Sequence, residues 1–166
     1  MRILLLIVIP YLSIFLESTL FSRYSLRGAV PDLVLIIVTF YALLNGRKAG
    51  FSYGFVCGLF EDLYLGRFIG MNALAKGLTG YVVGKLEVNV FKDNILVGFG
   101  GVIFSTVLNS TLMLLLAQIG HQHMVIDRSF LINLSGQVVY NGLLSIPFYV
   151  WYYRISKSDS IKMSKF

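Results

Sequence analysis

Two rows of small and polar residues, each at a spacing of four, constrain the fold of this chain more than any other feature. The first row is Gly50, Gly54, Gly58 and Asp62, and the second is Asn72, Lys76, Gly80 and Gly84. Residues four apart lie on one face of a helix, and glycine rows let membrane helices approach closely. We therefore predict an antiparallel pair of helices over Phe51–Leu63 and Met71–Lys85, and we take this pair as the centre of the fold.

The polar ends of the two rows predict a charged contact inside the membrane. In an antiparallel pair the glycines meet near one end, and Asp62, Asn72 and Lys76 meet near the other. An isolated carboxylate or ammonium is costly in lipid, so Asp62 is expected to pair with Lys76. This pair is either a structural link or part of a partner surface or of a cavity open to the outer side. Glu61 is a candidate for the same partner or cavity contacts, with the lipid headgroups as its alternative position.

The composition is that of an integral membrane protein. Of the 166 residues, 57% are hydrophobic and only 13% are charged, compared with about 25% charged in an ordinary soluble domain. Six apolar segments predict an all-α bundle of six transmembrane helices: Ile3–Phe21, Leu33–Leu44, Ala49–Leu65, Met71–Leu86, Ile95–Ile119 and Phe130–Tyr153. The second and third segments are short for a span of about 20 residues. A re-entrant hairpin, with four crossings in total, is therefore the alternative.

The lysines and arginines predict the orientation of the bundle. Nine lie at the two ends and in the second and fourth connections: Arg2, Arg47, Lys48, Lys85, Lys92, Arg154, Lys157, Lys162 and Lys165. The opposite connections hold four, which are Arg23, Arg27, Arg67 and Arg128. Positively charged loops stay in the cytoplasm, so both termini are predicted to be cytoplasmic. Residues 1–153 are expected to form one bundle, and residues 154–166 a basic cytoplasmic tail that is disordered.

Polar residues on the other helices predict faces that turn away from lipid. Two rows at helical spacing carry them: Gly101, Ser105 and Asn109 in one helix, and Asn133, Gln137, Asn141 and Ser145 in the last. Such faces either line an internal cavity or close against the first and fourth helices. In the first helix, Glu17 either looks into the bundle or reaches water near the helix end. Candidate partner or cavity residues are therefore Glu17, Glu61, Asn109, Gln137 and Asn141.

Motifs for chemistry are missing from the sequence. It has no nucleophile–histidine–acid arrangement, no zinc-protease motif and no phosphate-binding loop. We therefore expect no enzymatic activity, no cofactor and no metal. The net charge of +6 is attributed to helix ends that touch anionic lipid. Nucleic acid is not expected as a partner, because no basic helix or strand of useful length is present.

Four short motifs between Pro31 and Gly84 indicate a family. They are Pro31-Asp32-Leu33, the turn Gly46–Gly50, the run Gly54-x-x-x-Gly58-Leu59-x-x-Asp62, and Gly70-x-Asn72-Ala73-Leu74. As a set they resemble the signature of the MreD family of bacterial rod-shape-determining proteins. The motifs cover about a third of the chain, and the remaining helices match this family only in hydropathy.

The resemblance implies a non-enzymatic scaffold of the cell-elongation machinery in the bacterial inner membrane. Family members bind MreC and help couple MreB filaments to the peptidoglycan synthase pair of RodA and a class B penicillin-binding protein. Their fold is thought to be similar to the substrate-binding subunit of energy-coupling-factor vitamin transporters. A small-molecule-binding subunit of such a transporter is therefore the alternative. Those subunits dock through small residues spaced by four in the first helix, whereas Ile3–Pro10 is bulky here.

Overall fold

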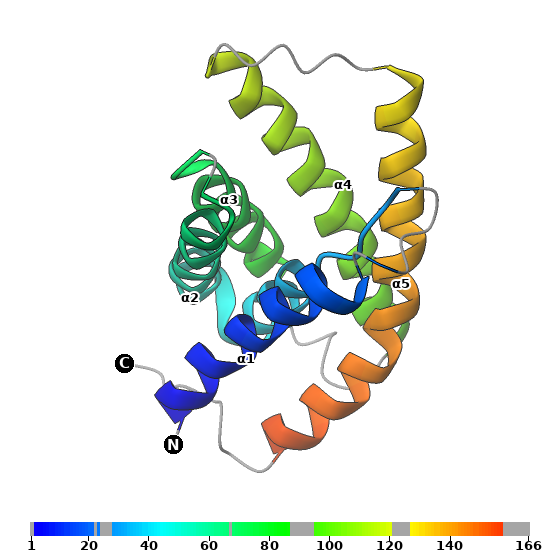
Figure 1. Cartoon of the computed structure of the whole chain (residues 1–166). Coiled ribbons are helices and arrows are strands. Elements are labelled where there is room, and N and C mark those ends of the chain that lie inside the picture. The colour runs from blue at the N-terminus through cyan, green and yellow to red at the C-terminus, as the bar shows by residue number, and fades with distance from the viewer. Residues whose placement is uncertain are drawn as a thin grey trace.

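The described part of the chain is built from helices joined by short connections. The computed structural model describes residues 2–21, 23, 28–66, 68–86, 95–120 and 127–157. Its elements are α1 (Arg2–Leu16), the π-helical turn η1 (Glu17–Phe21), α2 (Leu33–Leu65), α3 (Met71–Lys85), α4 (Ile95–Ile119) and α5 (Arg128–Lys157). Helices α2 and α3 form one closely packed group, α4 and α5 pack as a second pair, and α1 lies against α2 (Figure 1).

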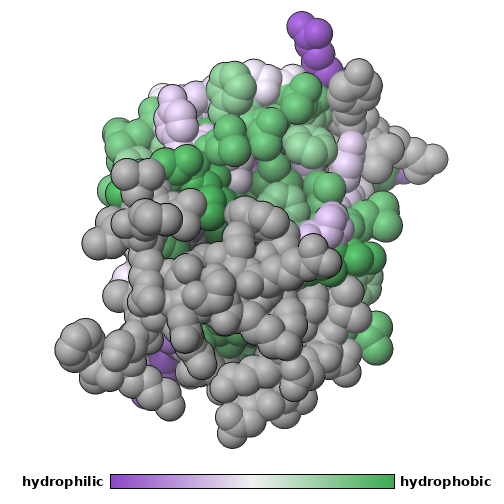
Figure 2. Space-filling view, turned by 90° about the horizontal axis from the view of Figure 1, so that it is seen from below, coloured by the Kyte–Doolittle hydropathy of each residue, from purple (hydrophilic) through white to green (hydrophobic). Residues whose placement is uncertain are grey.

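The surface of this bundle suits lipid. Among the described residues, two helical stretches are long and apolar enough to cross a membrane, Leu33–Leu65 and Leu96–Ile119. Hydrophobic side chains cover much of the coloured surface in Figure 2. Large apolar side chains such as Tyr11 and Ile119 are 69% and 74% exposed. Exposed apolar surface on this scale indicates contact with a membrane or a partner.

Helix α2 folds back on itself at Gly46. The φ of Gly46 is 84° and its ψ is 178°, a conformation that interrupts the helix and that side chains with a Cβ rarely adopt. The two halves then pack against each other, because a Cβ at Gly50 would lie 2.6 Å from the Cβ of Ala42 and one at Gly54 would lie 3.0 Å from Val38. The halves are antiparallel. The predicted break between the second and third helical segments is therefore confirmed, and it falls at Gly46.

The second half of α2 also packs closely against α3, along the two glycine rows. A Cβ at Gly50 would lie 2.5 Å from the carbonyl oxygen of Gly80, and one at Gly58 would lie 2.5 Å from the carbonyl carbon of Asn72. At the other end, a Cβ at Gly84 would lie 2.6 Å from the Cα of Arg47. The glycines therefore allow direct contact between the two backbones, as Gly-x-x-x-Gly faces do in membranes.

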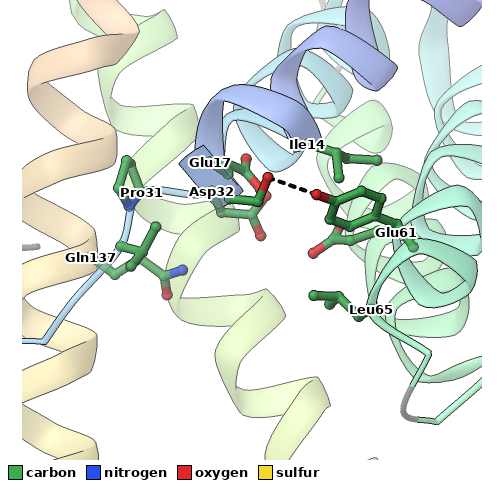
Figure 3. Close-up of a pocket in the computed structure, with 10 residues that line it drawn as sticks. Ile14, Glu17, Pro31, Asp32, Glu61, Leu65 and Gln137 are labelled. Atoms are coloured by element: carbon green, nitrogen blue, oxygen red, sulfur yellow. Dashed lines mark hydrogen bonds between the residues drawn. The ribbon is translucent and has the colours of Figure 1, made fainter. Parts of the chain in front are cut away.

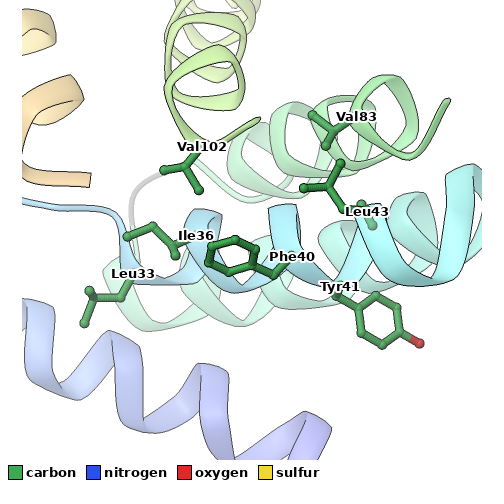
Figure 4. Packing of buried hydrophobic residues seen from close by; sticks show 8 residues of the cluster. Leu33, Ile36, Phe40, Tyr41, Leu43, Val83 and Val102 are labelled. Carbon is green, nitrogen blue, oxygen red and sulfur yellow. The ribbon is translucent and has the colours of Figure 1, made fainter. Parts of the chain in front are cut away.

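The centre of the molecule is the first half of α2. Every residue from Leu33 to Leu43 is buried, as expected for a helix that is apolar on all sides. Phe40 belongs to a cluster that includes Val83 of α3 and Val102 of α4 (Figure 4). The prediction that the hairpin of Phe51–Leu63 with Met71–Lys85 forms the centre is therefore wrong. That hairpin covers one side of the more apolar segment that precedes it.

The ends of the predicted helices differ in two places. The first helix ends at Leu16, and the widened turn of η1 carries the chain on to Phe21. The last helix continues to Lys157, so the first four residues of the predicted disordered tail are helical. Residues 158–166, and with them the rest of that tail, lie outside the described residues.

We predict that Gly54→Ala destabilises the fold. The added Cβ would lie 2.8 Å from the carbonyl carbon of Lys76, so α2 and α3 must separate. Overpacking of this kind costs about 1–3 kcal/mol. The matched control is Gly100→Ala in α4, because a Cβ there meets nothing within 4 Å. Thermal unfolding in detergent should show a lower Tm for the first variant alone, and equal Tm values would contradict the close packing.

Candidate functional site

A fully buried lysine lies between two carboxylates at the end of the α2–α3 pair. The Nζ atom of Lys76 lies 2.9 Å from Oδ2 of Asp32 and 2.6 Å from Oε2 of Glu61. Lys76 is 0% exposed, and Asp32 and Glu61 are 8% and 9% exposed. A buried charge is tolerated when it is paired in this way. The three residues connect the beginning of α2, the end of α2 and the middle of α3.

The beginning of α2 supplies the backbone donors of this site. Asp32 is the N-cap, and its Oδ1 accepts a hydrogen bond of 2.7 Å from the amide of Leu35. Glu17 of η1 accepts hydrogen bonds from the amides of Leu33 and Val34. Two carboxylates thus satisfy the free amides of the first turn, where the helix dipole favours negative charge. Of the two positions predicted for Glu17, the structure therefore shows the interior one.

Asp62 has a different role from the one predicted. Its carboxylate accepts hydrogen bonds from the backbone amides of Gly70, Asn72 and Ala73, and from the side-chain amide of Asn72. These donors belong to the start of α3, so Asp62, near the end of α2, caps that helix. The predicted Asp62–Lys76 ion pair is wrong, although the predicted meeting of Asp62 with Asn72 is confirmed.

The direction of the side chains explains the change of partner. Lys76 lies opposite Gly54 in the register of the α2–α3 pair. A helical side chain points toward the N-terminus of its own helix, so the long lysine side chain reaches toward the level of Glu61. Asp62, the next residue along α2, turns instead toward the free amides of α3. Glu61 is buried in this ion pair with Lys76.

Hydrogen bonds to buried polar side chains tie the site to α4 and α5. The amide of Asp32 donates to Oδ1 of Asn141 over 2.8 Å, and Nδ2 of Asn141 donates to Oγ1 of Thr106 over 3.0 Å. The residue before Thr106 on α4, Ser105, accepts a hydrogen bond from the hydroxyl of Thr39. Asn141 is fully buried. Polar residues of the last two helices thus contact each other and α2, and this contact with α2 was not predicted.

Other members of these rows have different surroundings. Asn109 is 6% exposed, and its Oδ1 has no hydrogen-bond partner among the described residues. Gln137 accepts a long hydrogen bond of 3.5 Å from Ser110 and lines two neighbouring cavities. Asn133 also lines the second of these cavities. The predicted cavity-lining role therefore applies to Asn133 and Gln137.

A cavity of about 260 Å³ opens beside the ion cluster. Glu17, Asp32 and Glu61 line it, together with Ile14, Ser18, Val30, Pro31, Tyr64, Leu65 and Gln137. In Figure 3 the three acidic side chains point toward one another from three different segments of the chain. The hydroxyl groups of Ser18 and Tyr64, which also line this cavity, lie 2.9 Å apart. The cavity is thus lined by both charged and apolar groups.

Acidic groups outnumber basic ones in the cluster. Oxygen atoms of Glu17, Asp32 and Glu61 lie within 4.8 Å of one another, and oxygen ligands of this kind suit a hard cation. The ammonium of Lys76 supplies a positive charge to the carboxylates of Asp32 and Glu61. Backbone amides at the start of α2 neutralise part of the charge of Glu17. The arrangement therefore holds η1, both halves of α2, and α3 together.

Three of the four charged residues of this cluster, Glu17, Glu61 and Lys76, are candidates from the sequence, whereas Asp32 is not. In the sequence, Asp32 stands out only as part of the Pro31-Asp32-Leu33 motif. Its position could have been found from the turn at Gly46, because Asp32 precedes that turn by nearly the same number of residues by which Glu61 follows it. In an antiparallel hairpin, such residues lie at the same level.

Comparison with known proteins decides the family. The model of the rod shape-determining protein MreD matches residues 1–158 of the chain. The chain belongs to the MreD family. No curated protein and no solved structure matched it. Members of the MreD family are membrane proteins that determine rod shape, so membership implies this role. The family is known for shape determination and not for catalysis.

We predict that Lys76→Met destabilises the protein far more than Lys85→Met. The first change leaves Asp32 and Glu61 as buried carboxylates without their partner, at a cost of about 3–5 kcal/mol. Lys85 lies on the same helix but is exposed, so its loss should have little effect. The fraction of protein that remains monodisperse after heating in detergent measures both variants. Similar curves for the two would contradict the structural role of Lys76.

We further predict which carboxylate is coupled to Lys76. In a double-mutant cycle, Lys76→Met combined with Glu61→Gln should show a coupling of about 1–3 kcal/mol. The cycle with Asp62→Asn should show a clearly smaller coupling, because Asp62 contacts the start of α3. Unfolding free energies of the single and double variants test this. A stronger coupling to Asp62 would restore the pair that the sequence had indicated.

Proposed function

We propose that this member of the MreD family is a non-enzymatic scaffold of the cell-elongation machinery in the bacterial inner membrane. In this proposal it binds MreC, and through MreC it helps couple MreB filaments to RodA and a class B penicillin-binding protein. The observation that carries the proposal is the match to the MreD model over residues 1–158. The partners follow from the family resemblance.

The contacts that the buried charged residues make support the role of a scaffold. Lys76, Asp32 and Glu61 contact one another, while Glu17 and Asp62 hold backbone amides at the starts of two helices. Each of these groups thus fixes one helix relative to another. A scaffold depends on a constant surface, and paired charges in a low-dielectric interior resist rearrangement. We infer that these residues act by maintaining the shape of the bundle.

We also propose that six segments of the chain cross the membrane, with both termini in the cytoplasm. The fold-back at Gly46 supports this count, because it divides α2 into two antiparallel halves. The beginning of α1 and the end of α5 lie toward the same end of the molecule in Figure 1, which supports termini on one side. The excess of lysine and arginine in the same segments supports the cytoplasmic side. We also propose that the fold is similar to that of the substrate-binding subunit of energy-coupling-factor transporters.

The proposal predicts that MreC co-purifies with the tagged chain in mild detergent. Lys76→Met should reduce the recovered MreC several-fold, because the helices that form the surface are no longer held together. Gly100→Ala is the matched control and should recover as much MreC as the unchanged chain. Quantitative blotting of eluates normalised to the tagged chain measures both. An unchanged chain that elutes as a monodisperse species without MreC would contradict the proposal.

A further inference from the structure

The turn between α2 and α3 exposes apolar side chains almost without interruption. Leu63, Tyr64, Leu65, Phe68 and Ile69 are between 49% and 71% exposed. A turn that projects into water is normally polar. Arg67 lies in the same turn, outside the described residues. The exposed side chains that the structure describes in this turn are therefore suited to an apolar surrounding.

The amides at the start of α3 are paired within the protein. The amides of Gly70, Asn72 and Ala73 donate to the carboxylate of Asp62, which is 2% exposed. The amides of Met71, Leu74 and Gly66 donate to nearby carbonyl oxygens. Lipid offers no partner to a free amide, so a backbone segment enters it only when its polar groups are paired internally. The cap that Asp62 provides meets this requirement at the start of α3.

The length of α3 also indicates that the turn lies within the bilayer. It has 15 residues, which correspond to about 22 Å at about 1.5 Å per residue. The hydrocarbon core of a bilayer is about 30 Å thick. If the exposed Lys85 lies at one headgroup layer, the other end of the helix does not reach the opposite layer. The turn then lies at the depth of the acyl chains.

The directions of these side chains fit lipid better than a single protein partner. Leu63, Tyr64 and Leu65 are consecutive residues of a helix, so their side chains point about 100° apart, and each is at least half exposed. A protein interface would cover one face and leave the others in water. The hydroxyl of Tyr64 is already paired with Ser18 and needs no partner from outside.

We propose that the described part of the α2–α3 turn is immersed in the bilayer, where lipid acyl chains near the headgroup boundary surround the side chains of Leu63, Tyr64, Leu65, Phe68 and Ile69. The turn then does not project into the aqueous phase. Asp62 makes this possible, because its buried carboxylate closes the start of α3. The surface is an additional membrane contact of the bundle and is independent of any protein partner.

The test uses tryptophan fluorescence of the full chain in vesicles of phosphatidylethanolamine and phosphatidylglycerol. The chain has one tryptophan, Trp151, so Trp151→Phe provides a silent background. Ile69→Trp reports on the turn, and Lys48→Trp, at an exposed position near the turn at Gly46, is the matched control. Lipids brominated along the acyl chain quench a tryptophan in the bilayer, and acrylamide quenches one in water.

We expect bromolipid to quench Ile69→Trp at least several-fold more than Lys48→Trp, and acrylamide to show the reverse order. Acrylamide quenching at position 69 equal to that at position 48, without bromolipid quenching, would place the turn in water and overturn the proposal. Quenching by neither agent would show that protein covers the turn, which also overturns it. If Ile69→Trp does not fold, Phe68→Trp is measured in its place with the same expected outcomes.

Discussion

The ammonium of Lys76, held between Asp32 and Glu61, is the interaction on which the rest of the structure depends. It joins three segments that are far apart in the sequence. The contact requires the close approach of α2 and α3, because the backbone of Lys76 packs directly against Gly54. A larger residue at that position would separate the helices and move the ammonium away from both carboxylates. The glycine rows and the charged cluster are therefore two parts of one arrangement.

Much of the helical framework could be predicted from the sequence. The spacing of Gly50, Gly54 and Gly58 fixes both the face and the register of the contact with α3, because only a residue without a side chain permits it. The break in α2 at Gly46 falls between the predicted segments Leu33–Leu44 and Ala49–Leu65. The central position of Leu33–Leu43 was not predicted, because a uniformly apolar segment has the same sequence pattern whether lipid or protein surrounds it.

The charged site was harder to predict than the packing. Sequence spacing showed that Lys76 needs an acidic partner, but Asp62 and Glu61 are neighbours, and about 100° of helix rotation decides between them. The free amides at the start of α3 compete for Asp62, and this competition is visible only once the hairpin is built. The contribution of Asp32 arises from the fold-back at Gly46, which brings the two ends of α2 together.

The order of these residues along the chain has a consequence for biosynthesis. Glu17, Asp32 and Glu61 are all translated before Lys76. Until the lysine emerges from the ribosome, the cluster holds only acids, and an unpaired acid in lipid costs about 2.5–3.5 kcal/mol on insertion scales. The early helices therefore gain by remaining near the insertion machinery until α3 arrives. The acids of the cluster can therefore be neutralised by Lys76 only after the chain has been synthesised as far as α3.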